Sequence, residues 1–445
     1  MPKHTVHKRI LPNSMKVLFI PVDTSDIVAV GIFIKTGSRY ENSKNNGIAH
    51  FLEHMMFKGT KNRPSNKISE ELDSVGAVYN AATSHESTYY YVYGHKNEMN
   101  LFLDIITDLY SNPLFLQEDI DKEKFVVVEE LAMYFDEPQE IIFDMFHDTM
   151  FYNSSLKMPI LGPEENILNF KRNDLVEFRK QFYIPSRTVM AISGNFDIDT
   201  VYDSLVNKFK KPTKYTVNRS IKIGHTLNIK KIDKQTIPYV YIKENYDISQ
   251  THIVMAFRTH SMHHKNNESL ELIENLLSVG SSSRLYDLLR NKMGVTYFNS
   301  SDNIAYSDEG AFVIHIGVDN ERVAEVIKAV LKELSNIKKH GITRNEYNKI
   351  KKLKNNSFLL SLQDPRDYMR YYGMSEVYSG IDIPNKNKIE RSYLIEDRLK
   401  SFANITKEAI EDTIRNTFIK ENLNIFVYGH FKDKSKIDEC LDVLD

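Results

Sequence analysis

The chain repeats itself, and this duplication constrains its fold more than any other feature. Three segments of the first half have counterparts in the second half, in the same order: 27–59 and 252–280, 89–110 and 311–334, and 189–209 and 424–444. Each is predicted to contain a strand followed by a helix, because a short run of mostly apolar or aromatic residues is followed by apolar residues at helical spacing. We therefore predict two similar domains, residues 1–212 and 236–445, with a lysine-rich solvated linker at 213–235.

The order of the predicted elements favours the α+β class. Strands such as 88–93 precede amphipathic helices, without the strict strand–helix alternation of a parallel α/β sheet. We expect each domain to be a mainly antiparallel sheet covered on one face by helices. The long helices are predicted at about 98–111, 118–136, 173–182, 268–278, 320–339 and 344–361.

The composition narrows the class of protein. The 445 residues carry a net charge of -2, so we expect neither nucleic acid nor an anionic membrane as a partner. No apolar run is long enough to span a bilayer, and the first residues lack the apolar core of a signal peptide. Cys440 is the only cysteine, which excludes an intrachain disulfide and predicts a packing role for this side chain. We expect the cytoplasm or another reducing compartment.

The pattern His50-Phe51-Leu52-Glu53-His54 carries the strongest chemical signal. On a helix, positions 50 and 54 are one turn apart, so both imidazoles leave the same face and can hold one zinc ion. Glu53 stands beside them, where a carboxylate can deprotonate a zinc-bound water. This is the metallopeptidase pattern H-E-x-x-H in reverse. Taken alone, the pattern also fits an ordinary histidine pair on a surface helix.

The second half of the repeat has lost this pattern. When Gly59 is aligned with Gly280, the positions of the two histidines and of Glu53 are taken by other residues: Glu271, Asn275 and Glu274, respectively. Since neither histidine is kept, we predict that only the first domain binds the metal.

A catalytic zinc needs a third protein ligand and an open position for water. The predicted helix at 119–138 offers several carboxylates. Glu123 and Glu130 are seven residues apart and share a face, whereas Glu129 points about 100° away. A solvated acidic helix would have the same composition, so these residues alone leave the choice of ligand open.

The motifs of the chain resemble those of a known family. They are similar to those of the inverzincin peptidases, which include pitrilysin, insulysin and the catalytic subunit of the mitochondrial processing peptidase. The length is similar to that of the short, two-domain members. The matching segments span nearly the whole chain: 11–17, 50–60, 74–91, 121–131, 160–167, 182–197 and 281–297.

The resemblance implies a set of site residues. It makes Glu53 the general base and implies one zinc ion per chain. Glu123 corresponds to a glutamate that orients a ligand without touching the metal. The metal ligands implied are His50, His54 and Glu130. Asn80, Ala81 and Thr83 are implied to contact the peptide on a strand edge near 79–84. Arg290 and Tyr297 are implied to contact the substrate near the scissile bond.

Two departures from the family pattern concern loops. Asn13-Ser14 replaces the usual Asn-Gly turn, and the glycine-rich loop of the second half is reduced to Gly280 followed by three serines. The second departure affects the expected mobility of that loop and not the metal ligands.

The resemblance implies a zinc-dependent endopeptidase that cleaves extended oligopeptides, or unfolded or presequence-like segments. A chain that carries both the zinc pattern and the Arg290–Tyr297 pair is expected to form a homodimer with two composite sites. Two alternatives remain: the catalytic half of a hetero-oligomeric processing peptidase, and a non-catalytic scaffold or binding subunit of the same fold. The natural substrate, the cleavage preference and the pathway do not follow from the sequence.

Overall fold

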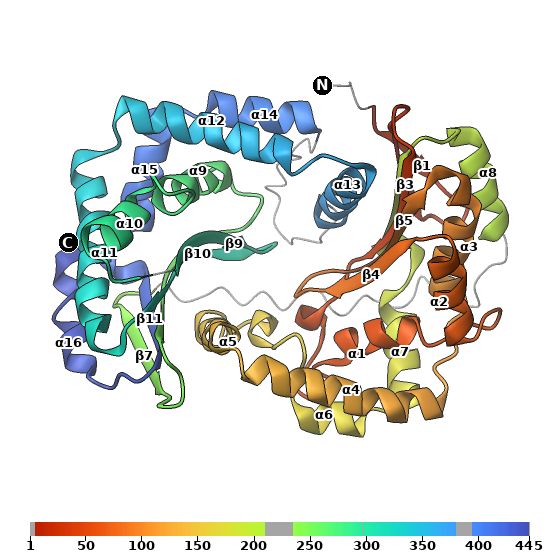
Figure 1. Cartoon of the computed structure of the whole chain (residues 1–445), viewed down its shortest axis with the longest axis horizontal. Coiled ribbons are helices and arrows are strands. Elements are labelled where there is room, and N and C mark those ends of the chain that lie inside the picture. Colours follow the sequence, from red (N-terminus) through yellow and green to blue (C-terminus); the bar gives the residue numbers. More distant parts are fainter. Residues whose placement is uncertain (1–4, 210–234, 297, 380–393, 445) are drawn as a thin grey trace. The chain divides into compact units, whose positions relative to one another are not determined.

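The computed structural model describes residues 5–209, 235–296, 298–379 and 394–444 (Figure 1). The chain divides into two compact units that are not contiguous in sequence. Unit 1 comprises Met1–Ala132, Ser154–Asn228 and Ser361–Asp382, and unit 2 comprises Met133–Asn153, Ile229–Leu360 and Ile383–Asp445. Each unit therefore contains most of one predicted domain and one segment from the other half. The predicted linker lies outside the described residues, except for Gln235.

Unit 1 is built on a six-stranded sheet with the order β1-β2-β6-β3-β5-β4. β2 and β6 are parallel and the other neighbours are antiparallel. β4 ends the sheet on one side. The strands are β1 (His7–Ile10), β2 (Lys16–Pro21), β3 (Ile27–Ile34), β4 (Val78–Thr83), β5 (Thr88–His95) and β6 (Thr188–Gly194).

Helices cover both faces of this sheet. On one face, Val30 and Ile32 of β3 join the main core of unit 1. On the other, α13 (Pro365–Ser379) packs on β3 and β6, where Gly31 and Gly373 leave room for the close approach. The first-half helices are α1 (Ile48–Met56), α2 (Ser65–Ser74), α3 (Met99–Ser111), α4 (Gln117–Phe135), α6 (Glu164–Asn169), α7 (Arg172–Phe182) and α8 (Ile198–Lys208).

Unit 2 repeats the plan with a five-stranded sheet in the order β7-β11-β8-β10-β9. β7 and β11 are the parallel pair. Its strands are β7 (Tyr239–Glu244), β8 (Thr251–His260), β9 (Phe298–Ala305), β10 (Glu309–Val318) and β11 (Leu423–Gly429). Its helices are α9 (Asn267–Leu277), α10 (Arg284–Tyr286), α11 (Val323–His340), α12 (Arg344–Leu360), α14 (Ile395–Asn404), α15 (Lys407–Thr417) and α16 (Lys434–Asp438).

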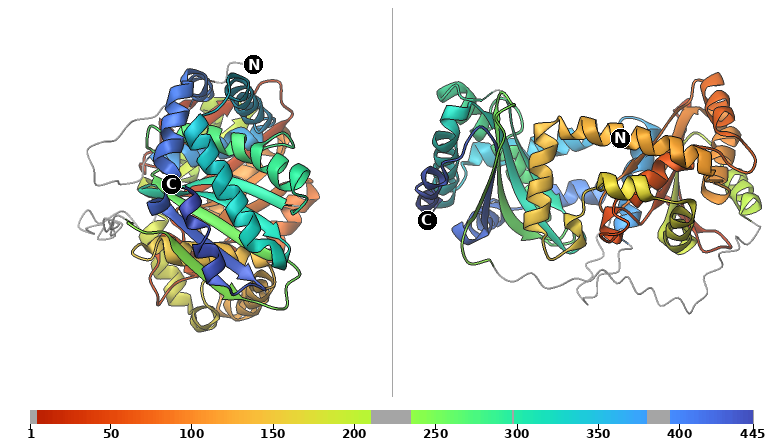
Figure 2. Two further views of the ribbon diagram at one scale, coloured as in Figure 1. Left: turned by 90° about the vertical axis from the view of Figure 1, so that its left-hand side faces the viewer. Right: turned by 90° about the horizontal axis from the view of Figure 1, so that it is seen from below.

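The first half of the chain supplies one helix to unit 2. α5 (Pro138–Met150) packs on β8 and β11 and lies beside these strands in Figure 2. α5 and α13 are thus exchanged between the two parts of the sequence. The predicted α+β class and the mainly antiparallel sheets are confirmed, but the expectation of one covered face is wrong. The central strands are buried on both sides, as β6 and β11 illustrate, and the second side is covered by the exchanged helix.

The departure at Asn13-Ser14 has a structural consequence. Ser14 adopts a left-handed backbone conformation, with φ of 76°, in the turn between β1 and β2. Its backbone N–H donates to the carbonyl of Leu11, and the Asn13 side chain accepts from the N–H of Met15. A glycine would adopt this conformation without the steric cost of a Cβ atom.

No helix within the described parts of the chain combines the length and apolar character that crossing a bilayer requires.

Candidate metal centre

α1 presents the two histidines, and a buried carboxylate fixes where this helix begins. Gly47 precedes α1 with a φ of 97°. The backbone N–H groups of Gly47 and Ala49 donate to Glu41 at 2.8 and 2.7 Å, and burial raises the pKa of Glu41 to about 7. A carboxylate at this end also suits the helix dipole. The other side of α1 packs into the core through Phe51, Leu52, Met55 and Met56.

The predicted pair, His50 and His54, lies on one face of α1, with ring centroids 4.7 Å apart. Glu130 of α4 completes a cluster: one carboxylate oxygen lies 3.3 Å from Nε2 of His54 and the other 3.7 Å from Nε2 of His50. The donor atoms all lie within 4.8 Å of one another. The ligand atoms of a tetrahedral zinc site lie roughly 3.3 Å apart, so this spacing suits the ion.

Glu123 orients His54 from the other side of the ring. Its Oε1 lies 2.9 Å from Nδ1 of His54, and its Oε2 lies 2.5 Å from Nζ of Lys58. When Nδ1–H donates to Glu123, a neutral ring presents the Nε2 lone pair to Glu130. Two acceptors at that distance repel each other unless a proton or a cation lies between them. The donor set therefore fits a metal ion.

The pKa values of the cluster follow from burial and these contacts. Burial lowers the pKa of His50 to about 4, and the neighbouring His54 adds to the effect. Burial also acts to lower the pKa of His54, but hydrogen bonds to Glu123 and Glu130 outweigh it and raise that pKa to about 9. The hydrogen bond from His54 holds the pKa of Glu130 below its usual range. Together the groups form a compact site in which His50 offers a lone pair and Glu130 a carboxylate, while a metal ion would displace the proton that the raised pKa keeps on His54.

Glu53 stands next to the cluster and is held by a strand. The hydroxyl of Thr83, on β4, donates to Oε2 of Glu53 at 2.7 Å. Burial raises the pKa of Glu53, while the Thr83 hydrogen bond and the nearby His54 act in the opposite direction. A carboxylate with a raised pKa, beside a metal site, is suited to taking up a proton from water and releasing it again.

The strand that holds Glu53 is the last of its sheet. β4 pairs with β5 alone, and its other edge forms the end of the six-stranded sheet. On this strand Asn80 is exposed, and its Oδ1 accepts the backbone N–H of Ala81 at 2.8 Å. The predicted peptide contacts, Asn80, Ala81 and Thr83, therefore lie on one exposed edge strand that is also tied to Glu53.

Arg290 and Tyr297 lie apart from this cluster in the chain, and their predicted role stays a prediction. Arg290 belongs to unit 2, in the helical turn Asp287–Lys292, and its Nη1 donates to the carbonyl of Thr296 at 3.3 Å. Tyr297 lies outside the described residues.

The second half replaces the metal cluster with ion pairs. Glu271 of α9 lies 3.0 Å from Nζ of Lys354 on α12 and also pairs with Arg398 of α14. Burial raises the pKa of Glu274, its neighbour on α9, to about 7. Across the described ranges, His50, His54 and Glu130 form the one group of three that could hold a metal ion.

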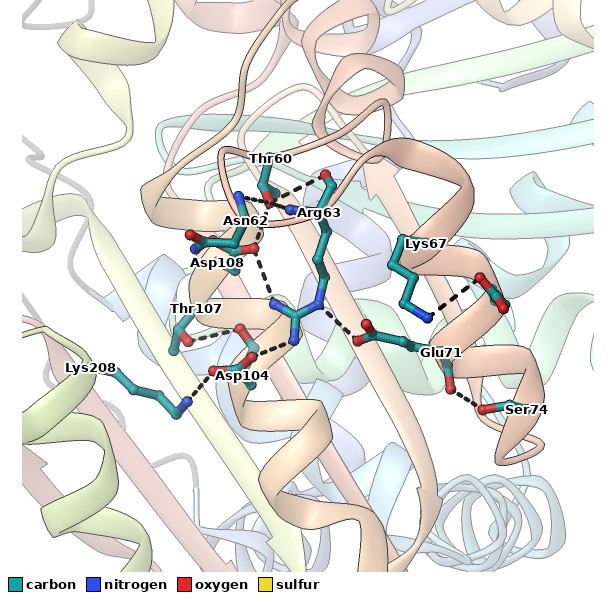
Figure 3. A network of polar contacts seen from close by, with 11 residues as sticks. Thr60, Asn62, Arg63, Lys67, Glu71, Ser74, Asp104, Thr107, Asp108 and Lys208 are labelled. Carbon is teal, nitrogen blue, oxygen red and sulfur yellow. Dashed lines mark hydrogen bonds and ion pairs between the residues drawn. The ribbon is translucent and has the colours of Figure 1, made fainter.

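A polar network near α1 was not anticipated from the sequence (Figure 3). Arg63 pairs with Glu71, Asp104 and Asp108, while Asp108 also accepts hydrogen bonds from Thr60, Asn62 and Asn112. Backbone hydrogen bonds join the same loop to the segment between α3 and α4: the N–H of Lys61 donates to the carbonyl of Asn112, and the N–H of Leu114 donates to the carbonyl of Gly59. The loop after α1 is thus fastened to the segment before α4. These contacts connect α1, which carries His50 and His54, with α4, which carries Glu130. The only sequence signal was the run of polar residues at 60–63.

Comparisons with known proteins bear on this site. Residues 16–164 match the family described as insulinase, peptidase family M16, and residues 169–354 match the peptidase M16 inactive domain. An uncharacterized zinc protease of Bacillus subtilis, YmxG, is 32% identical over 83% of this chain and 87% of its own length. The chain belongs to peptidase family M16.

A second relative has a similar name, and a solved structure has a similar fold. An uncharacterized zinc protease of Rickettsia felis is 32% identical over 73% of this chain and 76% of its own length. A protease from Helicobacter pylori of known crystal structure has a TM-score of 0.82 at 22% identity, with 96% of this chain and all of that one covered (100%). The structural likeness shows the M16 fold. The cluster of His50, His54 and Glu130 lies in the stretch that matches the insulinase family, and the ion-paired counterpart lies in the stretch that matches the inactive domain.

Proposed function

We propose that this M16 protein is a zinc-dependent endopeptidase with one zinc ion per chain. The observation that carries the proposal is the convergence of His50, His54 and Glu130, with Glu53 held beside them by Thr83. The zinc-protease names of the relatives support it. In this proposal His50, His54 and Glu130 hold the metal. Glu123 orients His54, and Glu53 is the general base.

The chemistry divides between the ion and the protein. Bound zinc would lower the pKa of a coordinated water and polarise the scissile carbonyl. Glu53 takes the proton of the attacking water and passes it to the departing amine, so one carboxylate serves as base and acid. Burial, which raises the pKa of Glu53, brings it closer to the range in which both transfers are efficient. Glu123 keeps the Nδ1 proton of His54 in place throughout.

The proposed substrate is an extended peptide that adds as a strand to the free edge of β4. Backbone pairing gives affinity with little sequence preference, and it requires a segment that is not folded. Asn80 would then release the N–H of Ala81 to a peptide carbonyl. Oligopeptides and unfolded or presequence-like segments meet this requirement.

The test is hydrolysis of a quenched-peptide library by zinc-loaded protein, with Glu53→Gln as the inactive control. Cleavage that disappears in the variant supports the peptidase. Bound zinc without cleavage by the wild type would favour the catalytic half of a hetero-oligomer. Neither zinc nor cleavage would favour the scaffold subunit and refute the proposal.

We further propose, from the family resemblance, a homodimer in which Arg290 and Tyr297 of one chain serve the metal centre of the other by stabilising the tetrahedral oxyanion. Mixing Glu53→Gln and Arg290→Ala chains should then restore part of the activity. Chains that exchange subunits, as shown by mass, without any recovery would rule out sharing between subunits.

A further inference from the structure

Three tyrosines form a row on the face of the unit 1 sheet that is turned away from α1. Tyr89, Tyr91 and Tyr93 alternate along β5 with buried residues of the opposite face, Tyr90 and Val92. Their rings are stacked, with centroids 6.0 and 6.2 Å apart and planes 21° and 20° from parallel. All three side chains are only half-buried, so this sheet face offers aromatic surface to a ligand.

α13 stops short of covering this row. It packs on β3 and β6, and at the edge of β5 its Arg366 lies over the ring of Tyr93 at 5.2 Å. Beyond the row, the side chain of Val78 on β4 is 46% exposed, and Asn80 is exposed as well. The rings of Tyr89 and Tyr91 therefore border the edge strand on which a peptide would pair.

The register of β4 places only the small side chain of Ala82 opposite Tyr89, and this place is called the gap. Ala82 lies opposite Tyr89, and Asn80 lies opposite Tyr91, so these side chains share a face. A peptide strand added to β4 would lie about 10 Å from β5, two strand spacings away. Ala82 is too small to fill the space between, so a large side chain of the peptide can lean over it onto the ring of Tyr89.

The contact between Thr83 and Glu53 sets the position of this gap relative to the chemistry. Thr83 points to the face of Glu53, and Ala82, its neighbour, points to the tyrosine face. In a paired peptide, residues that face the metal centre therefore alternate with residues that face the tyrosines. The gap lies within one residue of the position at which Glu53 acts.

We propose that the tyrosine row selects aromatic side chains at every second position of the bound peptide, beginning next to the scissile bond. This rests on the proposed function. Aromatic rings gain from offset stacking on other rings beyond the burial of their area. The charge of Arg366 is already balanced by Asp364 and Asp367, at 3.6 and 3.4 Å, so the rings rather than a charge dominate this surface.

The experiment measures peptide binding to zinc-loaded Glu53→Gln, so that binding is separated from cleavage. Phenylalanine replaces alanine at one position of the peptide at a time. At alternate positions the substituted peptide should bind about 3- to 10-fold more tightly than the alanine parent, and at the other positions its affinity should be unchanged. Tyr91→Ala should remove the effect at one of these positions. Ala82→Ile, which fills the gap and removes no packing, should also weaken the preference for phenylalanine. Tyr241→Ala, on β7 of unit 2, is the matched control.

Arg370 of α13 is a second cation that acts on Tyr91, so a charge is the competing source of selectivity. Three results would overturn the proposal: aromatic preference at consecutive positions, a preference unchanged in both Tyr91→Ala and Ala82→Ile, or a preference for acidic residues that Arg370→Ala abolishes. Cleavage by the wild type is scored separately. Cleavage without alternation refutes the tyrosine row alone. Alternating binding without cleavage by the wild type leaves the row intact and counts against a peptidase that acts without a partner subunit.

Discussion

Glu123 lies 2.9 Å from Nδ1 of His54, although the two residues are 69 positions apart in the sequence. The contact decides which nitrogen of the imidazole carries the proton and leaves Nε2 for a metal. Lys58 holds the second oxygen of the same carboxylate, and these two partners outweigh burial and lower the pKa of Glu123. The carboxylate therefore stays ionised at neutral pH and can orient the ring.

Glu123→Gln is expected to weaken zinc binding about 10- to 100-fold while the fold is kept, because the amide accepts from Nδ1 less strongly than a carboxylate. Competition with a chromophoric chelator measures the change. Glu129→Gln, an exposed position on the same helix, is the matched control. Equal affinities in the two variants would contradict the orienting role.

Removing the metal should cost both activity and stability. Zinc at 100 to 1,000 times its dissociation constant should stabilise the folded chain by about 3–4 kcal/mol, because it binds the assembled cluster only. Chelation should lower the melting temperature accordingly, and added zinc should restore it. In His54→Ala the melting temperature should not respond to zinc; a full response there would place the metal elsewhere.

Asp108→Ala is expected to lower the free energy of unfolding by about 1–3 kcal/mol, because it removes a buried acceptor and leaves the buried hydroxyl of Thr60 without this partner. Asn112 donates to it as well, as do Thr60 and Asn62, which are drawn with Asp108 in Figure 3. Urea unfolding measures the loss. Asp121→Ala, exposed on α4, should change stability by less than about 0.5 kcal/mol. Similar values for the two variants would mean that the network contributes little.

The burial of His147 leads us to expect that the protein loses stability in acid. On α5, its ring nitrogens contact the carbonyl of Phe143 and the hydroxyl of Tyr306 at 2.8 and 2.7 Å, and burial lowers its pKa to about 4. The unfolded chain, with a pKa of 6.5, binds the proton more tightly. Stability is therefore complete above pH 6.5 and is lost as the pH falls towards 4, by about 3 kcal/mol at most.

The measurement is urea unfolding at pH 7.5 and pH 5, where about 2 kcal/mol of this loss should already appear. His147→Gln cannot take up the proton, so its stability should depend less on pH over the same interval. An unchanged dependence would assign the acid sensitivity to other groups.

Ser14→Gly should stabilise unit 1 by about 0.5–1 kcal/mol, because the relief of a left-handed backbone exceeds the entropic cost of glycine at this turn. Thermal unfolding would show a higher melting temperature. The same substitution at Ser74, which lies in α2, should be destabilising. A lower melting temperature in Ser14→Gly would show that the turn is not strained.

The local part of the metal centre follows from the sequence. His50, Glu53 and His54 lie within five residues, and the period of a helix is enough to place both imidazoles on one face. The apolar periodicity also predicts the helices well: the stretches 98–111 and 344–361 correspond to α3 and α12. Such features depend on short-range geometry that every helix shares.

The tertiary structure decided the rest. Glu130 meets the histidines, Glu123 meets the far side of His54, and Glu129 stays exposed, because the rotation of α4 against α1 is set by packing far along the chain. The tie between Thr83 and Glu53, and the exchange of α5 and α13 between the units, are contacts of the same kind. Periodicity shows which face of an element is apolar, but not which distant segment will cover it, since any apolar face of suitable shape satisfies the same burial requirement.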